Sequence, residues 1–108
     1  MALIVNITYT GAPSAARAFA DEMTSTGVVA GIRAEEGNLR YEYYQPLDDP
    51  DSIMLVDSWR DQAALDAHHA SPWMARIAEL RDRYDLHMRV ERYVSAEDNA
   101  QDVAFIRK

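Results

Sequence analysis

The chain has no cysteine among its 108 residues, and this absence excludes several kinds of site. Without thiols there is no disulfide, no thiolate-bound metal and no cysteine nucleophile. The lack of cysteine fits a reducing compartment, so we expect the protein in the cytoplasm. The sequence also has no phosphate-binding loop, no glycine-rich dinucleotide turn, no nucleophile elbow and no zinc motif.

Long apolar runs and positive charge are also scarce. No stretch approaches the roughly 20 apolar residues of a membrane-spanning helix, and we see no secretory signal. The 11 Lys and Arg residues against 18 Asp and Glu residues give a net charge of −7. An acidic chain is poorly suited to a phosphate backbone. We therefore expect neither a membrane nor a nucleic acid as a partner.

Aromatic and histidine side chains gather between Gly37 and Met74, which hold both tryptophans, two of the three histidines and three of the six tyrosines. Residues 39–45 alternate between two faces and are rich in tyrosine, which predicts a strand. Residues 53–59 begin with apolar side chains on both alternations, which predicts a central strand covered on both faces. The acidic, proline-containing segment 47–52 predicts a turn, and hence an antiparallel pair.

Two helical segments follow this pair of strands. Asp61 is expected to cap the first, because its carboxylate can accept from a free N–H of the first turn. Ser71 is expected to cap the second, with Pro72 at its first position. The stripe of the first segment holds Ala64, Leu65, His68 and His69, and that of the second holds Met74, Ile77, Ala78 and Arg81.

The remaining elements complete one domain over residues 1–95. We predict a strand at 3–9, a helix at 15–26 with a short continuation at 28–34, and a last strand at 86–94. The order β-α-β-β-α-β is that of the ferredoxin-like α+β fold, an antiparallel four-stranded sheet with helices on one face. Because the chain has no second layer for the other face, we expect a homodimer.

Residues 96–108 are expected to form a separate C-terminal arm. The arm begins with polar and acidic side chains and turns apolar at 103–106. An apolar terminal patch rarely stays free in water. We therefore expect it to add a strand to a sheet edge or to dock in a groove, for instance on the partner subunit.

Several short motifs occur in one order along the chain. They are EGNLRYE at 36–42, Asp49-Pro50, DSW at 57–59, ALDAH at 64–68 and Ser71-Pro72. In this order they resemble the antibiotic biosynthesis monooxygenase (ABM) family, including its quinol-monooxygenase-like members, over roughly residues 3–94. The resemblance implies a dimeric α+β barrel with one pocket per subunit, between sheet and helices. Several members oxidise quinol-like or polycyclic phenols with O₂ and without a cofactor. Others degrade haem, isomerise or dehydrate.

His68 and Asn6 are the candidate catalytic residues. Oxidation by O₂ without a cofactor needs a deprotonated phenol, and neutral His68 could take the proton. The alternative is a buried histidine that bonds a carbonyl or Asp57. The Asn6 amide could orient a substrate oxygen, or it could form an edge or interface hydrogen bond. We expect no cofactor and no metal site, since the acidic residues of the 47–52 turn show no fixed ligand spacing.

Aromatic side chains are the candidate walls of a substrate pocket. Trp59 could stack on a flat ring or serve as plain core. Trp73 could cover the pocket at the helical junction, or simply pack. The other candidate substrate-binding residues are Tyr41 and Tyr43, which share a strand face, and His69, for which a packing or dimer contact is the alternative. By contrast, Arg81 is interpreted as part of a solvated helix end and Glu35 as a turn carboxylate, neither in a site.

The sequence supports three hypotheses of function. The first is a cofactor-independent monooxygenase that oxidises a quinol-like or phenolic aromatic substrate with O₂. The second is a protein that binds or isomerises a small metabolite without redox chemistry. The weakest is haem binding. Haem-degrading relatives use an Asn, a Trp and a His, and here Asn6 and Trp59 fit, whereas the position of the His falls near Ile77.

Overall fold

The structure is a computed structural model that describes all residues, 1–108. It confirms the predicted order of elements. In chain order these are β1 (Leu3–Thr10), α1 (Ala15–Ser25), α2 (Val28–Arg33), β2 (Asn38–Tyr44), β3 (Ile53–Trp59), α3 (Gln62–His69), α4 (Trp73–Arg83), β4 (His87–Val94) and the 3₁₀ helix η1 (Ala100–Phe105).

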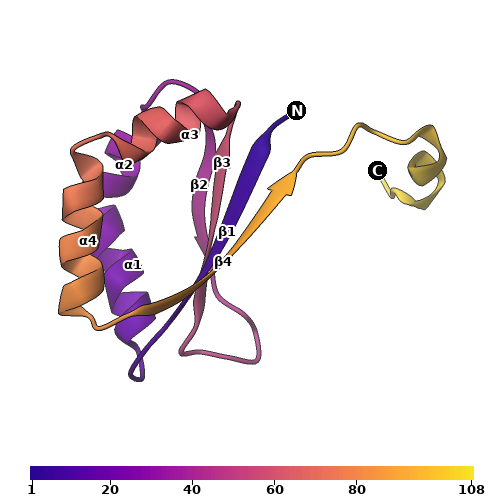
Figure 1. The fold of residues 1–108 in the computed structure, drawn as a ribbon. Coiled ribbons are helices and arrows are strands. Elements are labelled where there is room, and N and C mark those ends of the chain that lie inside the picture. Colours follow the sequence, from indigo (N-terminus) through magenta and orange to yellow (C-terminus); the bar gives the residue numbers. More distant parts are fainter.

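The four strands form one antiparallel sheet in the order β2-β3-β1-β4, which confirms the ferredoxin-like α+β fold. Figure 1 shows helices α1 to α4 on one face of this sheet and no α-helix on the other. The strands alternate accordingly. In β1 the side chains of Leu3, Val5, Ile7 and Tyr9 are buried toward the helices, and those between them lie on the open face.

The predicted N-cap residue is confirmed for α3 and is wrong for α4. Asp61 caps α3, because its Oδ1 accepts from the N–H of Ala64 at 2.9 Å. Ser71 was expected to cap α4, and this prediction is wrong. The capping position is Pro72, and Ser71 Oγ is buried without a hydrogen-bond partner. Instead, the backbone carbonyl of Ser71 accepts from the N–H of Met74 at 3.2 Å.

Strand β3 lies in the middle of the sheet, as predicted, but only one of its faces is covered within the chain. Ile53 and Leu55 are buried under the helices, whereas Met54 and Val56 are half-buried on the open face. The apolar side chains on this second face are therefore not covered by any element of the same chain.

None of the helices has the length and apolar character that a membrane-spanning segment needs.

The C-terminal arm separates from the body at Ser95, whose N–H donates to the carbonyl of Ala2 at 2.9 Å. Beyond this point the chain extends away from the sheet on the side opposite the helices (Figure 1). Of its apolar residues, 103–105 form the end of the 3₁₀ helix η1, and Ile106 follows that helix. Phe105 is 89% exposed, and Val103 and Ile106 are exposed as well.

Candidate functional site

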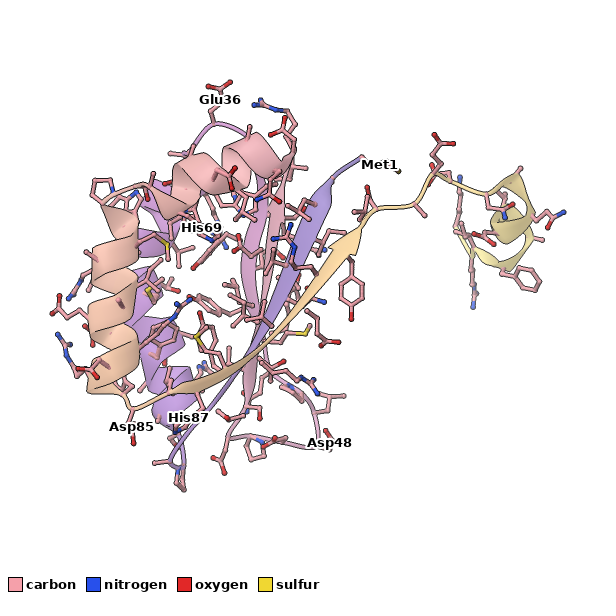
Figure 2. The ribbon with its side chains drawn as sticks, in the orientation of Figure 1. Met1, Glu36, Asp48, His69, Asp85 and His87 are labelled. Atoms are coloured by element: carbon pink, nitrogen blue, oxygen red, sulfur yellow. The ribbon has the colours of Figure 1, made fainter.

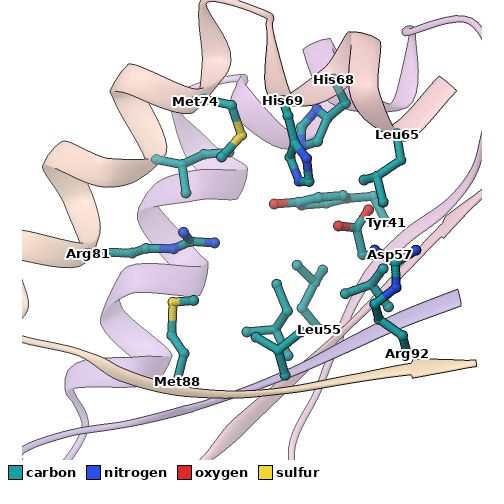
Figure 3. Close-up of a pocket in the computed structure, with 14 residues that line it drawn as sticks. Tyr41, Leu55, Asp57, Leu65, His68, His69, Met74, Arg81, Met88 and Arg92 are labelled. Carbon is teal, nitrogen blue, oxygen red and sulfur yellow. The ribbon is translucent and has the colours of Figure 1, made fainter. Parts of the chain in front are cut away.

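A cavity of about 190 Å³ lies between the sheet and helices α3 and α4. Its floor is apolar and comes from Val5, Ile7 and Leu55, and Leu65, Met74 and Ile77 close it from the helices. Strand β4 forms its outer edge with Met88, Val90 and Arg92, all of which are exposed. The polar side chains around it are Tyr41, Asp57, His68, His69, Arg81 and Arg92, which Figure 3 labels.

His68 is held in the cavity wall by two contacts. Its Nδ1 lies 2.7 Å from Oε2 of Glu35, and its ring stacks on Trp59 at a centroid distance of 4.7 Å. Burial lowers the pKa of His68, and the nearby Glu35 carboxylate opposes this shift. Neutral imidazole with its proton on Nδ1 donates to Glu35. Nε2 is then the nitrogen left to accept a proton from a ligand.

Asp57 is a buried carboxyl group on the same wall. Its Oδ1 accepts from Nε1 of Trp59 at 2.6 Å. Burial raises the pKa of Asp57 to about 7, although the Trp59 hydrogen bond and the Arg81 charge favour the ionised form. Asp57 and His68 therefore contact the same indole, Asp57 at its nitrogen and His68 at its face. The wall therefore combines a carboxyl group whose pKa is raised with an imidazole whose pKa is lowered.

Arg81 enters the cavity from α4 and is not the solvated residue that we expected. Its Nε and Nη2 donate to the hydroxyl of buried Tyr9, at 3.2 and 2.7 Å. The aliphatic stem shares the helical stripe of Met74 and Ile77, which turns the guanidinium toward the sheet. A cation therefore stands in the wall opposite Asp57, which Figure 3 also shows.

The structure brings three of the predicted site residues to this cavity, namely His68, His69 and Tyr41. Figure 2 shows His69 turned into the space between helices and sheet, whereas His87 lies near the other end of the domain. Tyr41 is buried, with its backbone carbonyl accepting from Nε of Arg33 at 3.0 Å. Burial raises the pKa of Tyr41 well above its usual value, so its phenol stays protonated.

The other four predicted residues do not line the cavity. Asn6 lies on the open face of β1, and its Oδ1 is buried without a partner. Trp59 lies behind His68. Tyr43 shares the Tyr41 face but packs edge-on against Phe19 instead. Trp73 packs over α2, where a Cβ added at Gly31 would lie 2.1 Å from its ring. An Asn6–His68 pair across one ligand is therefore not formed within the chain.

Three residues of the candidate site were not predicted as site residues from the sequence: Glu35, Asp57 and Arg81. Arg81 could have been found, because it falls on the same stripe as Met74 and Ile77. Asp57 was visible as a carboxyl group that interrupts an apolar strand. Glu35 gave no signal, since it lies in a turn with a second glutamate beside it. No group of three His, Asp or Glu side chains is placed to hold a metal ion.

Comparison with known proteins agrees with the fold and the motifs. The sequence profile of the antibiotic biosynthesis monooxygenase family matches residues 2–80, more than half of the chain. Over 57 residues the chain is 30% identical to YcnE of Bacillus subtilis (strain 168), a protein provisionally named a monooxygenase. This match covers 49% of the chain and 60% of YcnE, so the chain spans less than two thirds of that relative.

Two solved structures show the same fold. PA3566 from Pseudomonas aeruginosa is 28% identical with a TM-score of 0.74, over 89% of this chain and 95% of that one. SnoaB from Streptomyces nogalater, described as a cofactor-independent oxygenase, has a TM-score of 0.71 at 15% identity, over 92% of this chain and 97% of its own. At that identity SnoaB supports the fold alone. By its matched profile, the chain belongs to the antibiotic biosynthesis monooxygenase family.

Proposed function

We propose that the chain is a monooxygenase that oxidises a small quinol-like or phenolic aromatic molecule with O₂ and without a cofactor. The observation that carries the proposal is His68, a buried neutral imidazole whose Nδ1 is held by Glu35 and which borders a mostly apolar cavity. Family membership supports the reaction class. SnoaB, described as a cofactor-independent oxygenase, indicates that this fold is compatible with such chemistry.

The reaction needs no external reductant, because the substrate supplies the electrons. A hydroquinone and O₂ would give a hydroxyquinone and water, and each product would contain one of the two atoms of O₂. Nε2 of His68 would take the phenolic proton, and Glu35 would stabilise the imidazolium that forms. The phenolate is the electron-rich form that reacts with O₂. The apolar floor of the cavity would keep water away from it.

Oxygen uptake with hydroquinone and substituted hydroquinones tests this proposal. We expect substrate-dependent uptake that falls at least about 100-fold in His68→Ala, within the range of general base catalysis. His87→Ala is the matched control, because His87 is exposed on β4. Identical uptake by His68→Ala and wild type contradicts the role of His68. Absence of uptake by folded wild-type protein across the panel contradicts the proposed reaction.

A second function fits the same side chains. Asp57, with a pKa raised by burial to about 7, and neutral His68 form an acid and a base on one cavity. Such a pair suits proton transfer in an isomerase without redox chemistry. Product formed in the absence of O₂ would favour this alternative. Haem is a poor fit, since a cavity of about 190 Å³ is below the roughly 300–1,000 Å³ typical of pockets for drug-sized ligands.

We also propose a homodimer formed through the open face of the sheet, with the C-terminal arm, residues 96–108, docked on the partner. Met54 and Val56 are apolar on that face, and Asn6 Oδ1 lacks a partner there. The arm projects to the same side and ends in exposed apolar residues (Figure 1). The cytoplasm remains the proposed location, on the ground of the cysteine-free composition.

A further inference from the structure

The arginines around the cavity differ from most of those elsewhere in the chain. Six arginines form ion pairs with Asp or Glu: Arg17, Arg40, Arg60, Arg76, Arg83 and Arg89. Arg81 and Arg92, which both line the cavity, have no carboxylate within ion-pair distance. In a chain with a net charge of −7, two unpaired cations on one small cavity indicate a site for an anion.

The two guanidinium groups approach from opposite walls. Arg81 comes from α4 and Arg92 from β4, and Figure 3 shows Tyr41 and Asp57 between them. Arg92 is exposed, and its Nη2 donates to Oε1 of Gln62 at 2.6 Å. This bond ties the outer strand to the first residue of α3, which fixes the guanidinium at the rim. Most of its five N–H donors remain free for a ligand.

No acidic group near the cavity forms an ion pair with either arginine. Glu35 is engaged by His68 at 2.7 Å. Asp57 is buried, which raises its pKa and so favours its neutral form. A guanidinium that faces an apolar cavity is stabilised by a bound carboxylate, which it can grip through two parallel hydrogen bonds. A carboxylate on the ligand would therefore supply the negative charge that these two arginines lack.

From this arrangement we infer that the cavity selects a small phenol that carries a carboxylate, with Arg92 binding the carboxylate at the rim. The inference rests on the proposed function in one respect, because the phenol oxygen would face His68 and Arg81 on the inner side. The volume of about 190 Å³ limits the ligand to one ring or two small ones. Arg92 is thus a residue for specificity, while His68 acts on the phenol.

Binding without turnover separates this inference from the oxygenase reaction. We would titrate the protein calorimetrically under nitrogen with 2,5-dihydroxybenzoate and with hydroquinone, which differ only by the carboxylate. Wild-type protein should bind the acid at least about tenfold more tightly than the neutral phenol. In Arg92→Gln the ratio of the two dissociation constants should fall toward one, and Arg92→Lys should keep part of the preference.

Arg89→Gln is the matched control for charge. Arg89 lies on the same strand but points to the open face, 3.6 Å from Glu91, and its removal changes the net charge equally. We expect the Arg89→Gln variant to prefer the acid over the neutral phenol as strongly as wild type does. Equal binding of both ligands by wild type, no measurable binding of the acid, or an equal loss of preference in Arg89→Gln overturns the inference. A preserved preference without oxygen uptake would contradict only the proposed reaction.

Discussion

His68 and Glu35 meet at 2.7 Å although 33 residues separate them in the chain. The contact joins the last turn of α3 to the turn that leads into β2. It determines which imidazole nitrogen carries the proton, because a carboxylate can only accept. A flexible surface histidine would sample both tautomers. Here the carboxylate leaves Nε2 as the nitrogen that can accept a proton, so the proposed base is oriented before any ligand arrives.

Removal of the Glu35 charge should lower the pKa of His68 further. Burial already lowers this pKa, and the carboxylate opposes burial by stabilising the imidazolium. Glu35→Gln keeps the shape of the side chain but removes the charge. An NMR titration of the His68 Cε1–H signal should show a midpoint below 6.5 in wild type, and a lower one in the variant. Glu36→Gln, which removes an exposed carboxylate beside Arg60, should leave the midpoint in place. A higher midpoint in Glu35→Gln would contradict this assignment.

Replacement of Asp57 by Asn should stabilise the fold at high pH. The pKa of Asp57 is raised from 3.8 to about 7 in the folded state, so the native protein binds this proton more tightly than the unfolded chain. The resulting stability is complete below pH 3.8 and is lost as pH rises through about 7. The difference between the two values corresponds to at most about 4 kcal/mol. Asn is uncharged and can still accept from Trp59, so it avoids this loss.

Urea unfolding at pH 5 and pH 8 measures the effect. Asp57→Asn should gain stability relative to wild type between these values, by roughly 2–3 kcal/mol. Asp82→Asn, an exposed change on α4, should show no such gain. If Asp57→Asn loses stability equally at both pH values, burial does not determine the ionisation of Asp57.

The sequence predicted the fold well because periodicity and caps are local properties. The alternation in β1 and the Asp61 cap depend on neighbours within a few residues. The site depends on contacts between distant segments, and there the prediction was partial. His68 was identified from its chemistry, but its partner Glu35 follows from how a turn passes beside α3. Asn6 was placed in the site by its residue type, whereas the parity of β1 directs it to the open face.

Replacement of Gly31 by a larger residue should destabilise the fold while Trp73 is present. A Cβ at Gly31 would lie 2.1 Å from the Trp73 ring, so the indole must move. We expect Gly31→Ala to destabilise the fold by about 1–3 kcal/mol from overpacking, partly offset by up to about 1 kcal/mol of helix propensity. Thermal unfolding of Gly31→Ala, Trp73→Phe and the double variant tests the contact. The two changes should be non-additive, with the double variant more stable than the sum predicts. Additive effects would show that the two residues do not constrain each other.

A charge on the open face should disrupt the proposed homodimer. Val56 is half-buried at the centre of that face, between Asn6 on β1 and Glu42 on β2. Val56→Lys would place a cation in an apolar interface, where an unpaired charge is costly. Sedimentation equilibrium should give twice the 12.2 kDa chain mass for wild type and a shift toward monomer for the variant. Ala30→Lys, on the exposed side of α2, should leave the dimer intact.

Deletion of 96–108 should also weaken the dimer, since the arm carries exposed Phe105 to the same side of the sheet. A wild-type protein that sediments as a monomer at every concentration would require another cover for Val56 and another partner for the buried Asn6 Oδ1.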